Sequence, residues 1–276
     1  MGIYLTSVLA ALAVSTPVYH WDYEQAVHHA IAMKRDLVIY FREENNQDEI
    51  FRDPRVWIRL HRYVFVCLPV NYEYDGRRLL DYPAFRHMQG RGGVAVVACH
   101  DPNAENFLQV ISAHPFVKSR YHWVPDYGPE QISLILDFPN WLSLTQRSML
   151  YAVSVHPDKP LSVTGEPHAA LMEHCAWHSA RQAKLQWQHH ADLLAVSHQL
   201  QQRAGLVLNH ASEVVAESWG RVFGEETVLE AAFSCVDAWR QSPGHWAAVS
   251  RPCRYFGYDI QRGANGTWYA TGFFGY

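Results

Sequence analysis

Cysteines and charged residues are both scarce in this chain, and each scarcity excludes a class of protein. Only five of the 276 residues are cysteines (Cys67, Cys99, Cys175, Cys235 and Cys253), and no C-x-x-C pair occurs. A disulfide framework is therefore not expected, and only one pair within the last three cysteines stays open. Charged residues amount to 18% of the chain, and Lys and Arg do not cluster into the basic face of a nucleic-acid-binding protein.

A long apolar run is also missing. Ile3 to Ser15 is a run of 13 residues without charge, which is too short to span a bilayer but has the length of a signal-peptide core. No Lys or Arg precedes it. A signal peptide usually has a basic residue there, so the length and the lack of charge alone lead us to expect that residues 1–17 are an apolar export signal of a periplasmic or extracellular protein. A buried first strand or helix of a cytoplasmic protein is the alternative.

The apolar content, in contrast, is high enough for large cores. Hydrophobic residues make up 49% of the chain, and its length favours two domains. In residues 18–125, helical and strand-like patterns alternate, which predicts an α/β layer arrangement. The expected elements are helices at 21–34 and 54–61 and buried strands at 36–41, 63–70 and 92–98.

The phrase W…A…A…K-R-D-L-V-I-Y-F opens this half, and Gly92 and Gly93 open its third expected strand. In these features residues 18–125 resemble a thioredoxin-like domain. Redox chemistry on that fold needs a C-x-x-C after the first strand, but residues 43–48 contain no cysteine. The glycines also replace the proline that normally precedes the third strand. The resemblance therefore implies a redox-inactive, thioredoxin-like scaffold domain.

Residues 126–165 are expected to form a linker with one helix. Ser143-Leu-Thr-Gln146 has the spacing of a capping box, which marks a helix start. A cluster of Pro and Gly near residue 165 then marks the boundary of the last domain. Residues 166–276 predict an α+β domain, in which Asn265-Gly266 is a strong hairpin signal. Its expected elements are helices at 168–190, 192–204 and 226–239 and strands at 255–260 and 267–274.

Two imidazoles and a carboxylate stand in an otherwise apolar stretch of this domain, at His210, Glu213 and His245. If residues 210–213 form a helical turn, His210 and Glu213 share one face, since residues three apart point the same way. Two imidazoles and one carboxylate are enough ligands for zinc with an open position.

His174 and His178 form a second histidine pair, on the first expected helix of this domain. Their H-x-x-x-H spacing could also bind zinc, but the glutamate of the H-E-x-x-H motif is absent. A partly exposed helix face, with one histidine lining a groove, is the alternative.

Several phrases of the last domain occur together in one superfamily. They are His178-Ser179 followed by Gln182-Ala183, L-x-H ending at 210, W-x-x-S-P-G-H over 239–245 and G-x-W-Y-x-x-x-F over 266–273. In these phrases residues 166–276 resemble the CAP superfamily (cysteine-rich secretory proteins, antigen 5, pathogenesis-related 1) in its short bacterial, SCP-like form. The resemblance implies an α-β-α sandwich with a ligand groove.

Carried over by position, the resemblance assigns four residues to the groove: His178, His210, Glu213 and His245. It makes His210, His245 and Glu213 the ligands of zinc or another divalent cation. The chain departs from the family pattern at Ser212, Val214 and Arg240-Gln241, where a glycine, an asparagine and a second acid often stand. The missing second acid leaves one carboxylate for the expected metal.

These features favour a non-catalytic, exported binding protein over an enzyme. The expected ligand is a small molecule, a lipid, a glycan or another protein, with a divalent metal as candidate cofactor and with neither nucleic acid nor a transmembrane span involved. The alternative is a metal-assisted hydrolase or peptidase, in which His210 and His245 hold the metal and Glu213 is the general base.

Overall fold

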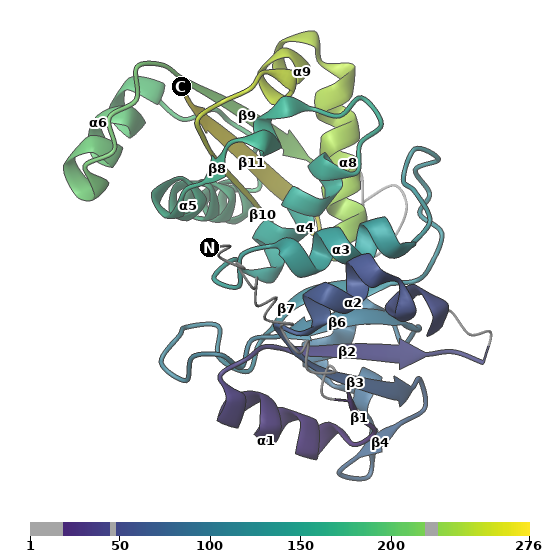
Figure 1. The fold of residues 1–276 in the computed structure, drawn as a ribbon. Helices are drawn as coiled ribbons and strands as arrows, with labels where there is room; N and C mark the ends of the chain where they lie inside the picture. Colours follow the sequence, from purple (N-terminus) through teal and green to yellow (C-terminus); the bar gives the residue numbers. More distant parts are fainter. Residues whose placement is uncertain (1–18, 45–47, 219–225) are drawn as a thin grey trace, which may run out of the picture.

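The computed structural model describes residues 19–44, 48–218 and 226–276. The expected export signal at 1–17 lies outside these residues. The described chain has a mixed α/β fold, as the sequence predicted, with two larger sheets and helices packed on both (Figure 1). A third, two-stranded sheet consists of β4 (Glu73–Tyr74) and β5 (Arg77–Arg78). Among the described residues, none of the helices combines the length and the apolar character needed to cross a bilayer.

The first sheet has five strands in the order β1-β3-β2-β6-β7. The strands β1, β3 and β2 are parallel, whereas β6 and β7 are antiparallel to their neighbours. The bounds are β1 (Tyr19–His20), β2 (Leu37–Arg42), β3 (Val64–Pro69), β6 (Gly93–Val97) and β7 (Val110–Pro115). The sequence patterns predicted β2, β3 and β6 but missed β1 and β7.

Both faces of this sheet are covered, which explains why its central strands are apolar throughout. Leu37, Ile39 and Phe41 of β2 pack on the side of helix α1 (Tyr23–Met33), and Val38 and Tyr40 face the opposite side. That opposite side is covered by α2 (Pro54–Leu60), α3 (Pro129–Asp137) and α4 (Leu144–Ser154).

The segment expected to be a linker instead contains two helices, α3 and α4. Ser143 caps α4 as its capping box predicted, with its hydroxyl 3.3 Å from the N–H of Gln146. However, α4 is buried on nearly every side, and it contacts β7 of the first sheet and β10 of the second. A single hydrophobic core therefore runs through α4 and joins the two halves of the chain.

The second sheet has four strands in the order β8-β10-β11-β9. They are β8 (Glu166–Pro167), β9 (Ala211–Glu217), β10 (Tyr255–Arg262) and β11 (Trp268–Gly275). The β10–β11 hairpin turns at Asn265-Gly266, as predicted, and Gly266 takes a φ of 83° there. Residues 211–217 form a strand, so the helical turn considered for residues 210–213 is wrong. The apolar run at 214–216 is buried in the sheet instead.

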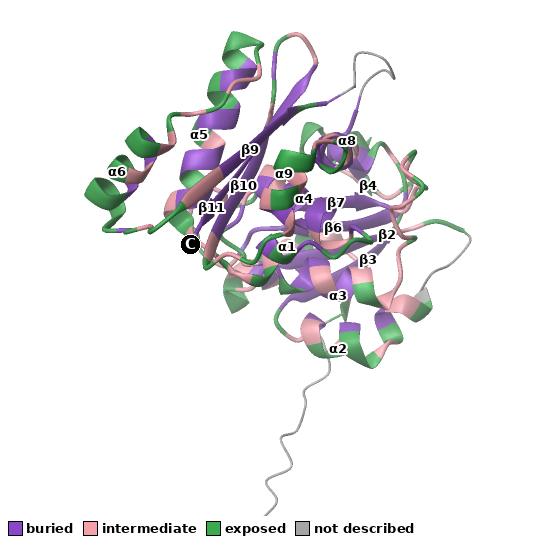
Figure 2. Ribbon diagram, turned by 90° about the horizontal axis from the view of Figure 1, so that it is seen from above, coloured by how far each residue is buried: buried purple, intermediate pink, exposed green. Residues whose placement is uncertain are grey.

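Helices cover both faces of the second sheet (Figure 2). One face carries α5 (Ala169–Leu185), with α6 (Leu193–Ala204) beside it. The other face carries α4, α8 (Val228–Gln241) and α9 (Pro243–Ser250). The helix expected at 168–190 ends at Leu185, where Gln186 adopts a left-handed conformation with a φ of 53°. This early end leaves residues 186–192 as a connection to α6.

Gly257 lets α5 lie directly on β10. A Cβ atom at this position would stand 2.4 Å from the carbonyl carbon of Leu171 and 2.5 Å from its oxygen. We therefore expect Gly257→Ala to displace α5 and to lower the free energy of unfolding by about 1–3 kcal/mol, the usual cost of overpacking. Chemical denaturation measures this change. Gly244→Ala in α9 is the control, because a Cβ there meets no atom within 4 Å. Equal stability of the two variants would contradict the close approach.

Candidate metal centre

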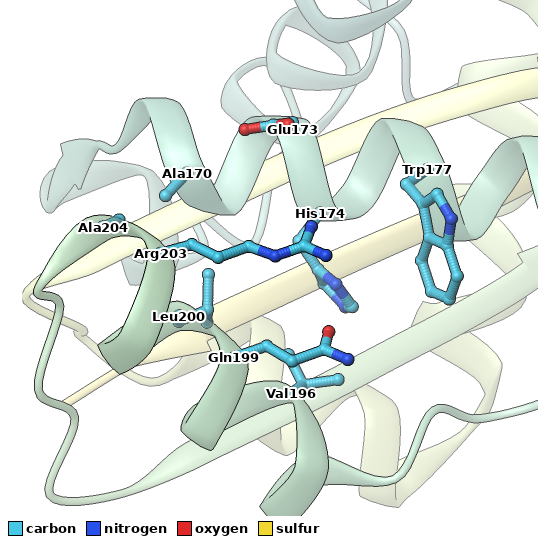
Figure 3. Close-up of a pocket in the computed structure, with 9 residues that line it drawn as sticks. All are labelled: Ala170, Glu173, His174, Trp177, Val196, Gln199, Leu200, Arg203 and Ala204. Atoms are coloured by element: carbon cyan, nitrogen blue, oxygen red, sulfur yellow. The ribbon is translucent and has the colours of Figure 1, made fainter.

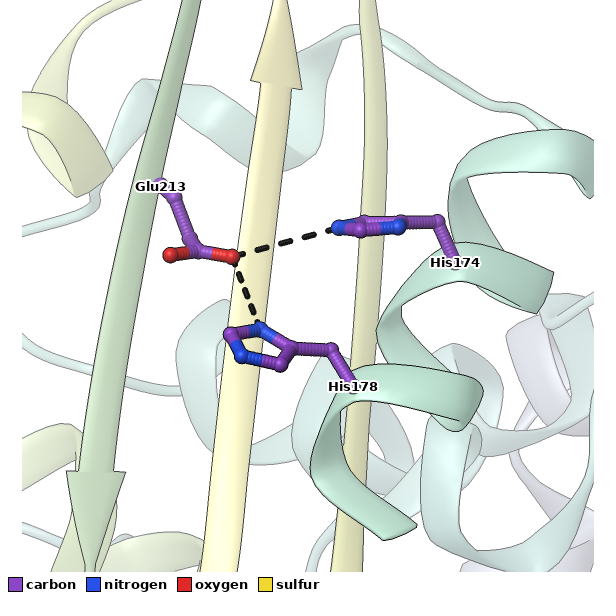
Figure 4. Close-up of side chains that lie close together, drawn as sticks. All are labelled: His174, His178 and Glu213. Atoms are coloured by element: carbon purple, nitrogen blue, oxygen red, sulfur yellow. Dashed lines mark ion pairs between the residues drawn. The ribbon is translucent and has the colours of Figure 1, made fainter. Parts of the chain in front are cut away.

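The candidate site lies between α5 and β9, on the face of the second sheet that α5 covers. His174 and His178 are one helical turn apart, so both rings point from α5 toward the sheet. Glu213 lies on β9, and the strand alternation that turns Val214 and Ala216 toward the core turns Glu213 toward α5. The three side chains converge, and all three residues are buried (Figure 4).

The converging atoms are spaced like the ligands of one metal ion. Nδ1 of His178 lies 2.9 Å from Oε1 of Glu213, and Nε2 of His174 lies 3.9 Å from the same oxygen. Tetrahedral zinc, with ligand bonds of about 2.0–2.1 Å, places its ligand atoms about 3.3 Å from each other. The two distances lie on either side of that value, so small side-chain adjustments bring all three atoms to one ion.

The same atoms lack well-aligned hydrogen bonds within the described residues. Nε2 of His174, both ring nitrogens of His178 and Oε1 of Glu213 are buried, and within the described residues none has a partner with hydrogen-bond alignment. The 2.9 Å approach of His178 to Glu213 is thus close in distance but poorly directed for a hydrogen bond. Buried polar atoms normally have partners, because an unpaired one costs about 1–3 kcal/mol. A bound cation would satisfy the three ligand atoms at once.

The other carboxylate oxygen of Glu213 is fully engaged. Its Oε2 accepts a hydrogen bond from the backbone N–H of Ala191 at 2.8 Å and lies 3.1 Å from Nδ1 of His190. His190 in turn approaches His245 of α9, with 3.4 Å between the two Nε2 atoms. Glu213 therefore stands between two inner histidines on α5 and an outer pair at the surface.

The surroundings of Glu213 keep its carboxylate ionised. Burial alone would raise the pKa of Glu213, but the imidazoles of His174 and His178 and the N–H of Ala191 together hold this pKa well below its usual range. Burial lowers the pKa of His245, and the neighbouring His190 lowers it further. A carboxylate anion and a neutral imidazole are the forms that bind metals.

A pocket of about 240 Å³ opens beside His174, between α5 and α6 (Figure 3). The ring of His174 lines this pocket and also belongs to the group of candidate metal ligands. Arg203 extends from α6 across the pocket toward this ring. The other lining residues are mostly apolar: Ala170, Glu173, Trp177, Val196, Gln199, Leu200 and Ala204.

The structure brings together three of the four groove residues that the resemblance implied. His178 contacts Glu213 directly, and His245 reaches it through His190. His210 is exposed at the start of β9, and its backbone carbonyl accepts the N–H of Tyr276. Within the described chain, no hydrogen bond or ion pair joins the His210 ring to Glu213 or to His245.

The sequence patterns did not indicate His190, and they gave His174 no carboxylate partner. The H-x-x-x-H spacing of His174 and His178 did indicate a metal site, but the local sequence has no carboxylate in the H-E-x-x-H position. That partner comes from β9, far along the chain. His190 lies in the α5–α6 connection, where no motif or periodicity marks it.

Comparisons with protein-family models and with curated proteins find no match to this chain. Among solved structures, the chain is similar to an outer surface protein from Borrelia burgdorferi. The two share 17% sequence identity over 40% of this chain and 76% of that chain, with a TM-score of 0.31. A likeness at this level shows neither a shared fold nor a shared function.

Proposed function

We propose that this chain is a metal-dependent binding protein, in which His174, His178 and Glu213 hold one divalent cation. The observation that carries this proposal is the set of buried ring nitrogens and carboxylate oxygen that converge with no well-aligned hydrogen-bond partner among the described residues. The adjoining pocket between α5 and α6 supplies a binding place for a small-molecule ligand, since His174 lines both.

The donor set favours zinc among the common cations. Two imidazole nitrogens and one carboxylate oxygen suit Zn²⁺, whereas Mg²⁺ and Ca²⁺ prefer sites built from oxygens alone. Three protein ligands also leave one position of a tetrahedral zinc ion for water or for an external ligand.

Binding is better supported than hydrolysis. A general base must take a proton from water, but Glu213 has one oxygen at the inner histidines and the other at Ala191 and His190. The lowered pKa of this carboxylate also makes it a weak base. These contacts suit a metal ligand more than an acid/base catalyst.

No disulfide joins the cysteines of the described residues, and burial raises the pKa of Cys99 to about 12 and that of Cys253 to about 11, which supports a function without thiol chemistry. Membership of residues 166–276 in the CAP superfamily and a thioredoxin-like first half are supported by the phrases quoted above. Export to the periplasm or the cell exterior is supported by the uncharged run at Ile3–Ser15.

Zinc titration by calorimetry tests the metal site. The wild-type chain is expected to bind zinc in the buried cluster, and His178→Ala is expected to weaken this binding by at least about 100-fold, because one of three ligands is lost. His198→Ala is the matched control, since His198 is an exposed histidine of α6.

A circular-dichroism melt of each variant separates lost binding from lost folding, and His174→Ala provides a second ligand deletion. The proposal is contradicted if the wild-type chain binds no zinc, or if both folded variants, His174→Ala and His178→Ala, bind it as tightly as wild type.

A further inference from the structure

A groove of about 720 Å³ lies between the two halves of the chain, and none of the three candidate metal ligands lines it. The β6–β7 connection, at residues 100–109, contributes one side of the groove, and α5 contributes another. Residues 141–146, at the start of α4, provide the rest of the lining. The volume falls within the range of about 300–1,000 Å³ that is usual for sites of small organic ligands.

An exposed tryptophan lines this groove. Trp141 lies two residues before Ser143, the N-cap of α4, and is 44% exposed. The next residue, Leu142, is fully buried in the core, so the backbone that carries the indole is held in place. Trp141 therefore offers a ligand a flat apolar face on a rigid support.

The polar groups of the groove are mainly hydrogen-bond acceptors. Glu105 and Glu173 contribute exposed carboxylates, and within the described residues neither carboxylate has an ion-pair or hydrogen-bond partner. The amide nitrogens of Asn106 and Gln109 donate to the carbonyls of Asn140, at 3.2 Å, and Glu105, at 2.9 Å. Their amide oxygens remain as acceptors. The groove therefore suits a ligand that supplies many donors.

A buried carboxylate orients the histidine of the groove. Asp36, just before β2, accepts hydrogen bonds from the backbone N–H groups of Cys99 and His100, at 2.9 and 3.2 Å. The same oxygen lies 2.7 Å from Nδ1 of His100 and accepts its proton there. The neutral ring then keeps a lone pair on Nε2, which is a further acceptor that is held in place before a ligand arrives.

We propose that this groove binds a neutral oligosaccharide built from β-1,4-linked sugars of the gluco configuration. The equatorial hydroxyls of such a chain supply the donors that the carboxylates and amide oxygens require, and its axial C–H groups form flat apolar faces that stack on Trp141. Among the described residues that line the groove, none is a lysine or an arginine, so the groove does not suit a phosphorylated or acidic ligand.

Calorimetric titration of the full chain with cellotetraose and with chitotetraose, in the presence of a chelator, tests the proposal. The wild-type chain is expected to bind at least one of them. Trp141→Ala is expected to weaken this binding by at least about tenfold, because the stacking face is lost. Glu105→Gln, in the exposed β6–β7 connection, is expected to weaken it as well. Trp187→Ala is the matched control, because Trp187 is a 66% exposed indole outside the groove.

The outcomes separate this proposal from the metal site. Tetrasaccharide binding that His178→Ala keeps and Trp141→Ala weakens would support the groove, whatever the zinc titration shows. The proposal is overturned if the wild-type chain binds neither tetrasaccharide, or if Trp141→Ala and Glu105→Gln, folded by circular dichroism, bind as tightly as wild type. Spermidine is the comparison ligand, since the carboxylates alone would attract a cation. Binding of spermidine without either tetrasaccharide would also overturn the proposal.

Discussion

Glu213→Gln is expected to weaken zinc binding at the buried cluster by at least about 100-fold, because an amide replaces the only anionic ligand. The same change is expected to cost the metal-free chain about 1–3 kcal/mol of unfolding free energy. Oε2 of Glu213 accepts hydrogen bonds from Ala191 and His190, and a neutral amide oxygen is a weaker acceptor for both than the carboxylate.

Calorimetric titration with zinc measures the change in metal affinity of Glu213→Gln. Chemical denaturation of the metal-free chain measures the change in its free energy of unfolding. Glu217→Gln is the matched control, because Glu217 ends the same strand but is exposed. Both variants remove one negative charge, so a general change of net charge affects them equally. Zinc affinity in Glu213→Gln equal to that in Glu217→Gln would contradict the role of Glu213 as a metal ligand.

The stability of the chain is expected to fall steeply as the pH drops from 7 toward 5. Burial and the neighbouring Arg147 lower the pKa of His114 to about 3, and burial, with Arg86 and Arg262 nearby, lowers that of His87 to about 4. In the unfolded chain both histidines take up protons near pH 6.5. Between pH 6.5 and the folded pKa values, the unfolded state therefore binds more protons than the folded state.

Each of these two histidines then removes about 1.4 kcal/mol of stability per pH unit below pH 6.5. Asp259 acts in the opposite direction, because burial raises its pKa to about 6, so its folded form gains stability as the pH falls from 6 toward 4. The two histidines outweigh the one carboxyl group. The net loss between pH 7 and pH 5 is expected to be roughly 2–3 kcal/mol.

Chemical denaturation at several pH values measures this slope. His114→Gln is expected to reduce the slope between pH 4 and pH 6 by about 1.4 kcal/mol per unit, whatever its effect on stability at pH 7. His28→Gln removes an exposed imidazole of α1 and serves as the comparison. A slope in His114→Gln that matches wild type would show that His114 is not buried as a neutral ring.

Much of the fold could be predicted because local patterns mark its elements. The apolar runs predicted β2, β3 and β6, and the capping box of Ser143 predicted α4. Strand β7 was missed because its polar residues, Ser112 and His114, are buried in this structure and hide the apolar pattern. The sequence also did not predict that α4 joins the two halves of the chain. That position depends on the packing of two sheets, which the local sequence around α4 does not specify.

The candidate site could be predicted only in part. Its carboxylate, Glu213, and two of its histidines were named from the sequence, but the arrangement around them depends on how α5 packs on the second sheet. That packing brings His174 and His178 to Glu213, and the early end of α5 at Leu185 places His190 beside it. The motif that suggested His210 fixes its position in the chain but not the direction of its ring.

The central claim is that the inner histidines of α5 and Glu213 of β9 bind one zinc ion. Crystals of the zinc-loaded chain, measured on both sides of the zinc absorption edge, test it most directly. We expect an anomalous peak at about 2.0–2.2 Å from Nε2 of His174, Nδ1 of His178 and Oε1 of Glu213. A zinc-loaded crystal with no peak there, or with its strongest peak at His210, would contradict this account.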